Sequence, residues 1–180
     1  MISDAHEGLK GAIASVFLGS GWQRCKVHFL RNVLAQIPKG NSEMVLAAIR
    51  TIFAQPDEAH VRDQFSTIAM MLGRQLPKVQ AMLEDARDDL LAFASFPPEH
   101  WKKIWSTNPL ERLNREVKRR TDVVGVFPNP EALLRLAGSV LIEAHDEWAV
   151  SDRRYLSESS MAMLDAMPPE EVVSAQLLPA

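Results

Sequence analysis

Two acidic residues that lie far apart in the sequence, Asp4 and Glu111, are the strongest candidates for chemistry. Asp4 comes two residues after Ile2, at the expected end of a truncated strand, and Glu111 lies in the first turn of a helix expected to begin at Asn108. If the fold brings the two carboxylates together, they can bind Mg²⁺, which prefers oxygen ligands and in pairs promotes phosphodiester cleavage. Spacing alone favours plainer roles, because Asn108 and Glu111 fit a capping box and Asp4 can cap the helix after it.

Cys25 and His28 have the spacing of half a zinc site. A structural zinc site needs four ligands, and the other histidines are scattered without a second Cys/His pair. We therefore favour packing or hydrogen bonding for both residues over zinc binding. A single cysteine cannot form an internal disulfide, which agrees with a reducing compartment.

Positive charge is concentrated between Trp101 and Thr121, although the whole chain has a formal net charge of −3. On a helix, Arg112, Arg115 and Arg119 share one face, next to a face that contains Glu111, Arg115 and Lys118. Guanidinium groups beside a metal-binding carboxylate are well placed to hold phosphates. The predicted DNA contacts are Arg112, Arg115, Lys118, Arg119 and Arg120. Spacing leaves open the alternative of a solvated basic helix in which Glu111 pairs with Arg115.

The elements that must position these residues are mostly helices. Apolar residues at i, i+3 and i+4, bounded by Pro, Asn and Gly, predict helices over 6–17, 28–37, 42–53, 57–72, 77–93, 108–120 and 131–148. A strand is predicted over 22–27. Leu110, Leu113 and Val117 are expected on the buried side of the 108–120 helix. Residues 151–180 have no clear period and are expected to form a loosely packed tail.

The composition is that of a globular chain with a core. The 180 residues are 47% hydrophobic and 24% charged. No apolar run of about 18 residues is present, and the first residues lack the features of a secretory signal. We therefore expect a cytoplasmic protein with no membrane partner.

Three sequence blocks carry a resemblance to a known family. They are SDAHEGL at 3–9, WQRCKVHFLRNV at 22–33 and TNPLERLNREVKRRT at 107–121, followed by VGVFPN at 124–129. In order and spacing they closely resemble the mutator-type transposases of bacterial insertion sequences, and the match runs from Ser3 to about Trp148. The block around Glu111 is highly specific.

The resemblance implies an RNase H-like fold with a helical insertion. It also implies a DDE triad that binds two divalent metals, Mg²⁺ or Mn²⁺, and cleaves and transfers DNA strands. Asp4 takes the place of the second aspartate and Glu111 that of the glutamate, while Cys25 and His28 match a signature of unassigned role. Residues 1–40 would be a remnant of the core, 41–95 the insertion, 96–150 the glutamate helix with a C-terminal core helix, and 151–180 a tail.

The chain departs from the family pattern at its start. The family's first aspartate, opening strands and DNA-recognition region all precede the second aspartate, and this chain begins three residues before Asp4. We therefore expect a mainly α chain, a truncated RNase H-like α/β domain with its opening strands missing and Asp4 on a sheet edge without neighbours. Such a C-terminal fragment is expected to be inactive in transposition by itself.

Three functional hypotheses follow from the sequence. The first is a fragment of a DNA transposase, with insertion-sequence ends and target DNA as partners and self-association as an open question. The second is a non-catalytic helical module that binds nucleic acid or an intact transposase through the basic helix. The third is a degenerate product without a role.

Overall fold

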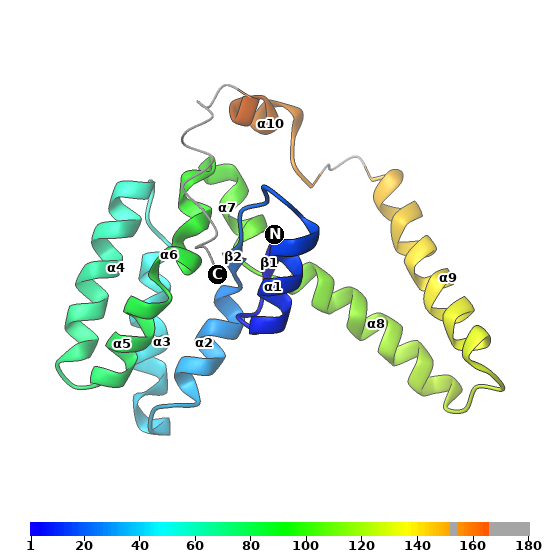
Figure 1. The fold of residues 1–180 in the computed structure, drawn as a ribbon, viewed down its shortest axis with the longest axis horizontal. Helices are drawn as coiled ribbons and strands as arrows, with labels where there is room; N and C mark the ends of the chain where they lie inside the picture. Colours follow the sequence, from blue (N-terminus) through cyan, green and yellow to red (C-terminus); the bar gives the residue numbers. More distant parts are fainter. Residues whose placement is uncertain (152–154, 166–180) are drawn as a thin grey trace. The chain divides into compact units, whose positions relative to one another are not determined.

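The computed structural model describes residues 1–151 and 155–165, most of them in helices. The chain divides into two compact units. The first unit runs from Met1 to Ser106 and resumes at Glu158, and the second runs from Thr107 to Ser157. Figure 1 shows the elements of both units. The prediction of a mainly helical chain is confirmed.

A two-stranded parallel sheet opens the first unit. It consists of β1 (Ile2–Ser3) and β2 (Gln23–Arg24), joined through α1 (Glu7–Val16). The helix is needed because parallel strands cannot be joined by a tight turn. Of the strand predicted over 22–27, only two residues pair. Asp4 follows a strand at the edge of the sheet, as expected, but the expectation that it has no neighbours is wrong, because β1 is paired with β2.

The rest of the first unit up to Ser106 is helical and contains the core. Its elements are α2 (Lys26–Leu34), η1 (Lys39–Asn41), α3 (Ser42–Ile52), α4 (Glu58–Gly73), α5 (Pro77–Asp85), α6 (Arg87–Leu91), η2 (Ala92–Ser95) and α7 (Pro98–Ile104). Phe29, Phe65 and Phe93 are among the largest fully buried side chains. A local signal marks the start of α4, where the Asp57 carboxylate accepts a hydrogen bond from the His60 amide at 2.9 Å.

Two predictions for this region are corrected by the structure. The helix predicted over 77–93 is broken at Ala86, which is fully buried and has φ −93° and ψ 1°. The chain turns there, and the two pieces α5 and α6 both reach the core. The helix α7 was not predicted, because Pro97 and Pro98 indicated only a break, whereas Pro98 occupies the first turn of a helix.

The second unit is a pair of helices, α8 (Asn108–Val124) and α9 (Pro130–Ala149), which pack against each other. α8 continues beyond the predicted end at Arg120 and stops at Gly125, whose φ of 74° suits glycine. Asn129 caps α9, and its Oδ1 accepts a hydrogen bond from the Ala132 amide at 2.8 Å.

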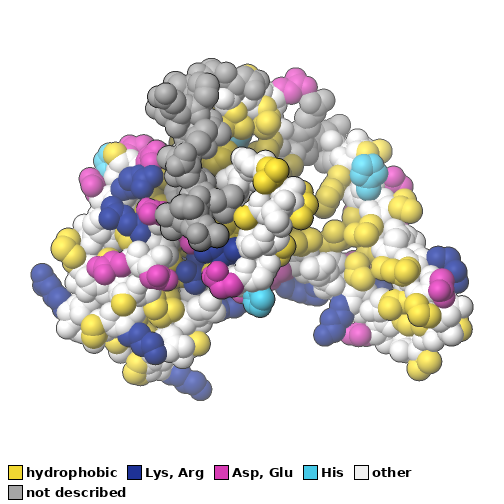
Figure 2. Space-filling model, in the orientation of Figure 1, with side chains coloured by type: hydrophobic (Ala, Val, Ile, Leu, Met, Phe, Trp, Pro, Cys, Tyr) yellow, Lys and Arg dark blue, Asp and Glu magenta, His cyan; other side chains and the backbone are white. Residues whose placement is uncertain are grey.

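This helix pair leaves much apolar surface uncovered. Leu110, predicted to be buried, is 56% exposed, and Leu113 and Val117 are only partly buried. Two helices bury little more than the stripe along which they touch, and Val140 is the buried hydrophobic residue of this pair. Exposed hydrophobic side chains also gather along α9 (Figure 2), among them Leu134, Leu141, Ile142 and Trp148.

The segment predicted to be a loosely packed tail contains the helix α10 (Glu158–Asp165), in which Ser160 is buried. The remaining parts of that segment, 152–154 and 166–180, lie outside the described residues. No helix in the described ranges has the length and apolar character needed to cross a membrane.

Candidate functional site

Asp4 and Cys25 lie at the same end of the parallel sheet. The register pairs Ser3 with Arg24, so that Asp4 directly follows β1 and Cys25 directly follows β2. The amide of Cys25 donates to the Ser3 carbonyl oxygen at 2.8 Å, which continues the strand pairing. In open α/β sheets, functional groups collect outside the carboxyl ends of parallel strands. Asp4 is therefore placed where a ligand-binding carboxylate is typically found.

Hydrogen bonds fix the chain around Asp4. The half-buried Asp4 accepts a hydrogen bond at Oδ1 from the Ala5 amide at 2.8 Å. The Ser3 hydroxyl donates to the Asp4 carbonyl oxygen at 2.9 Å and accepts from Trp22 Nε1 at 2.7 Å. The alternative that Asp4 caps the following helix is wrong, because His6 is at the N-cap of α1 and no side chain caps it.

Cys25 and His28 lie at the start of α2. Cys25 is fully buried at its N-cap position, and its carbonyl oxygen accepts a hydrogen bond from the Phe29 amide at 3.0 Å. His28 lies one turn further and is partly buried. Within the described residues, no three His, Cys, Asp or Glu side chains are arranged to hold a metal ion. Burial of the thiol agrees with the packing role favoured from the sequence.

Glu111 lies in the first turn of α8 in the second unit. Thr107, and not Asn108, is the N-cap residue, so the capping box from Asn108 to Glu111 is not formed. Instead the Thr107 hydroxyl donates to Glu111 Oε1 at 3.2 Å. Asp4 belongs to the first unit and Glu111 to the second, and each carboxylate is oriented by a neighbour in its own unit.

The five predicted DNA contacts on α8 fall into two groups. Arg112, Arg115 and Lys118 are exposed and form no salt bridge with any described residue. Their spacing of three residues places each beside the next on the helix surface. These three residues therefore form a basic strip, which can bind phosphates without first breaking an internal ion pair.

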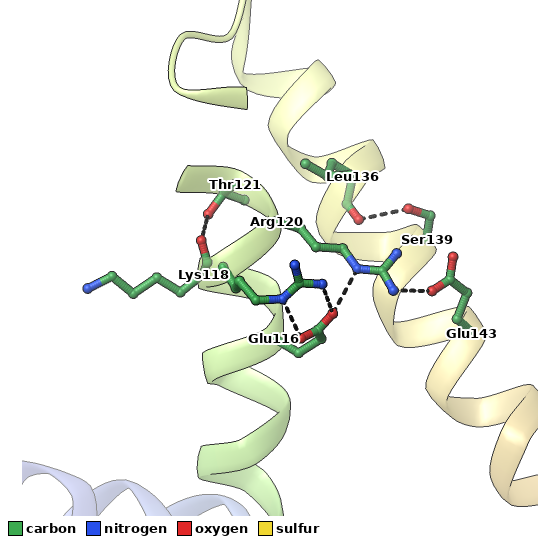
Figure 3. A network of polar contacts seen from close by, with 8 residues as sticks. Glu116, Lys118, Arg120, Thr121, Leu136, Ser139 and Glu143 are labelled. Atoms are coloured by element: carbon green, nitrogen blue, oxygen red, sulfur yellow. Dashed lines mark hydrogen bonds and ion pairs between the residues drawn. The ribbon is translucent and has the colours of Figure 1, made fainter. Parts of the chain in front are cut away.

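Arg119 and Arg120 form a network with two glutamates (Figure 3). Arg119 donates to Glu116 through Nε at 3.0 Å and Nη2 at 2.7 Å. Arg120 donates through Nε to Glu116 at 3.0 Å, and its Nη2 lies 2.7 Å from Glu143 Oε2 on α9. Hydrogen bonds from Arg119 and Arg120 lower the pKa of Glu116 to about 2. Glu143 was not among the predicted residues, because no local spacing links it to α8.

The model of the transposase family described as "Transposase, Mutator family" matches residues 1–151. The chain belongs to the Mutator family of transposases. The matched part of this Mutator-family chain contains Asp4, Cys25, His28, Glu111 and the basic residues of α8. The family assigned from the three sequence blocks is thus confirmed.

Curated relatives agree with the family match. The Mutator-family chain is 48% identical over 154 residues to the transposase for insertion sequence element IS1081 of Mycobacterium tuberculosis, covering 86% of this chain and 37% of that protein. It is 40% identical over 159 residues to the transposase for IS256 in transposon Tn4001 of Staphylococcus aureus, covering 87% of this chain and 40% of that protein. The chain therefore spans about two fifths of the length of these relatives.

Proposed function

We propose that the chain provides the part of a DNA transposase that contains two of the three carboxylates of a DDE site, Asp4 as the second aspartate and Glu111 as the glutamate. The observation that carries this proposal is that the family match includes both carboxylates, with Asp4 at the carboxyl end of a parallel strand. The proposal includes an RNase H-like fold in which 1–40 and 96–150 belong to the core and 41–95 to a helical insertion.

The residues present suit a hard divalent cation such as Mg²⁺ or Mn²⁺. Both ligands are carboxylates, and each has one oxygen held by a hydrogen bond, from the Ala5 amide in Asp4 and from the Thr107 hydroxyl in Glu111. Asp4 and Glu111 would hold such cations, which as a pair would supply activation of the attacking oxygen and stabilisation of the leaving oxygen of a phosphodiester. Arg112 and Arg115, on the same helix as Glu111, hold the phosphates of the DNA in position.

Strand cleavage and transfer are activities of the whole protein in this proposal. The chain spans 37% of the length of the IS1081 relative, and a two-metal site needs a full cage of ligands. We propose that the chain by itself binds metal and DNA but does not transpose.

Calorimetric titration with Mn²⁺ tests the metal assignment. Asp4→Asn and Glu111→Gln are expected to weaken Mn²⁺ binding by at least about tenfold, because each removes a charged ligand. Glu147→Gln, which removes an exposed carboxylate from the end of α9, is the matched control and leaves binding unchanged. Equal Mn²⁺ affinity in all four proteins would contradict the roles of Asp4 and Glu111.

A nicking assay on insertion-end DNA with Mg²⁺ or Mn²⁺ tests the need for the rest of the protein. No nicking by the folded chain is expected. Nicking that Glu111→Gln abolishes would show that the chain is sufficient for catalysis and that this part of the proposal is wrong.

The exposed basic strip on α8 favours a second candidate function, a non-catalytic module that binds DNA. In that case DNA binding survives Glu111→Gln but is weakened when Arg112 and Arg115 are replaced. Loss of Mn²⁺ binding in Glu111→Gln would argue against this candidate as the whole function.

A further inference from the structure

A cluster of aromatic rings lies in the first unit, on residues outside the sites predicted from the sequence. Phe93 lies at its centre, with its ring centroid 5.5 Å from Phe53, 5.2 Å from Trp101 and 5.6 Å from Trp105. Phe53, Phe93 and Trp101 are buried, whereas Trp105 is only partly buried. The cluster is therefore a packed platform that reaches the surface at Trp105.

The Lys26 ammonium covers this platform. Its Nζ lies 3.3 Å from the ring centroid of Trp105 and 4.7 Å from that of Phe53. The Lys26 amide also donates to the Trp105 carbonyl oxygen at 2.9 Å, which joins the start of α2 to the end of α7. The ring faces attract the cation, and the hydrogen bond fixes the backbone of Lys26 beside Trp105.

Two cationic side chains, Arg50 and Lys102, act on Lys26. Burial, and next the neighbouring Arg50, lower the pKa of Lys26 to about 8, and Lys102 adds to this effect while Cys25 opposes it. Arg50 on α3 and Lys102 on α7 are exposed, and Lys26 forms no salt bridge within the described part of the chain. A partly desolvated cation with two cationic neighbours gains free energy when an anion approaches.

The arrangement fits a chain of phosphates better than a stacked base. The three cations come from three helices, α2, α3 and α7, and Arg50 and Lys102 lie near enough to Lys26 to lower its pKa. The Lys26 ammonium already covers the Trp105 ring, so a base cannot stack on that face. Contacts of this kind hold the DNA backbone without selecting its sequence.

We propose that Lys26, Arg50 and Lys102, supported by Trp105, form a second DNA-backbone contact in the first unit, in addition to the basic strip on α8. This inference rests on the proposed function, which supplies DNA as the ligand. It adds a contact on residues other than the five DNA contacts predicted from the sequence.

Salt titration of DNA binding tests the proposal, with fluorescence anisotropy of a labelled duplex of arbitrary sequence as the readout. Arg50→Gln with Lys102→Gln is expected to reduce the slope of log affinity against log salt by about 0.9 for each phosphate that the protein no longer neutralises, or about two in all. Lys26→Met keeps the aliphatic stem over Trp105 and is expected to reduce the slope by about one.

Lys39→Gln with Arg74→Gln is the matched control, because it removes two exposed cations of the same unit far from the aromatic cluster in sequence. Its slope is expected to equal that of the unaltered chain. Far-ultraviolet circular dichroism and thermal unfolding confirm that each variant is folded. If Lys26→Met does not fold, the double variant Arg50→Gln with Lys102→Gln still tests the proposal, because both residues are exposed.

Three outcomes separate this inference from the proposed function. A reduced slope for Arg50→Gln with Lys102→Gln, but not for the control, supports the inference. Equal slopes for the two double variants overturn it, and the proposed function survives if Arg112→Gln with Arg115→Gln still weakens binding. If the unaltered chain shows no salt-dependent DNA binding, both are wrong.

Discussion

Arg120 on α8 and Glu143 on α9 form an ion pair between the two helices, with Nη2 2.7 Å from Oε2. The same guanidinium also donates to Glu116 at 3.0 Å, so Arg120 links a glutamate of its own helix to one of the next. Arg120 was among the residues predicted to bind DNA. Arg119 and Arg120 are therefore paired with glutamates, and Arg120 links the two helices. The other predicted contacts form no salt bridge with a described residue and are available to phosphates; they are Arg112, Arg115 and Lys118.

Arg112→Gln with Arg115→Gln is expected to weaken DNA binding more than Arg119→Gln with Arg120→Gln. The first pair forms no internal salt bridge in the described part of the chain, so its full charge is available to phosphates and the salt slope falls by about two. The second pair is already neutralised by Glu116 and Glu143 and contributes less. Anisotropy titrations over a range of salt concentrations measure both slopes, and a larger effect of the second pair would contradict this division.

Glu116→Gln is expected to destabilise the second unit at neutral pH and to remove part of its sensitivity to acid. The pKa of Glu116 is lowered from 4.5 to about 2 in the folded chain by hydrogen bonds from Arg119 and Arg120. The stabilisation is therefore fully present above about 4.5 and is lost as the pH falls towards about 2.

Thermal unfolding followed by circular dichroism at neutral and acidic pH tests this sign. The unaltered chain should lose stability in acid, and Glu116→Gln should lose less. Glu147→Gln removes an exposed carboxylate of the same helix pair and serves as the control. An equal acid-induced loss in Glu116→Gln and the unaltered chain would show that the network does not stabilise the helix pair.

Structural features that depend on residues close together in the sequence could be predicted. The cap of α9 is one, because Asn129 acts on the amide of Ala132 three residues later. The position of Asp4 after a strand is another, because Ile2 two residues earlier already indicated the end of a strand. The break at Ala86 could not be predicted in this way, since the pattern over 77–93 is helical throughout and the break depends on how α5 and α6 pack.

The other features that the sequence did not predict depend on contacts between residues that are distant in sequence. Lys26 and Trp105 meet only in the folded first unit, and neither residue belongs to a pattern that indicates the other. Leu110 was expected to be buried because apolar residues recur on one side of α8, yet a helix pair covers only the stripe around Val140. Periodicity shows which face is apolar, but not what covers it.

Phe93→Ala is expected to be strongly destabilising. Phe93 is fully buried and contacts three aromatic rings, so its removal costs about 3–5 kcal/mol. That is a large part of the roughly 5–15 kcal/mol by which a domain is stable. Urea unfolding measures the change, with Met70→Ala as the control because Met70 is 62% exposed. A loss equal to that of the control would mean that the aromatic cluster is not part of the stable core.

The contribution of Lys26 to stability is expected to rise with pH. Its pKa is lowered from 10.5 to about 8 in the folded chain, by burial first and by Arg50 next. Below about 8 the amine is charged in both the folded and the unfolded chain, so folding bears the full cost of desolvating it. Between about 8 and 10.5 the folded chain loses this proton first, and the cost disappears.

Urea unfolding of the unaltered chain and of Lys26→Met across this pH window tests the sign. Stability relative to Lys26→Met should increase for the unaltered chain as the pH rises from about 8 towards 10.5. Lys39→Met, which replaces an exposed lysine of η1, should follow the unaltered chain throughout. If the curves of Lys26→Met and the unaltered chain are parallel, the ammonium is not desolvated by the aromatic cluster. Lys26 would then behave as a solvent-exposed lysine despite its neighbours Arg50 and Lys102.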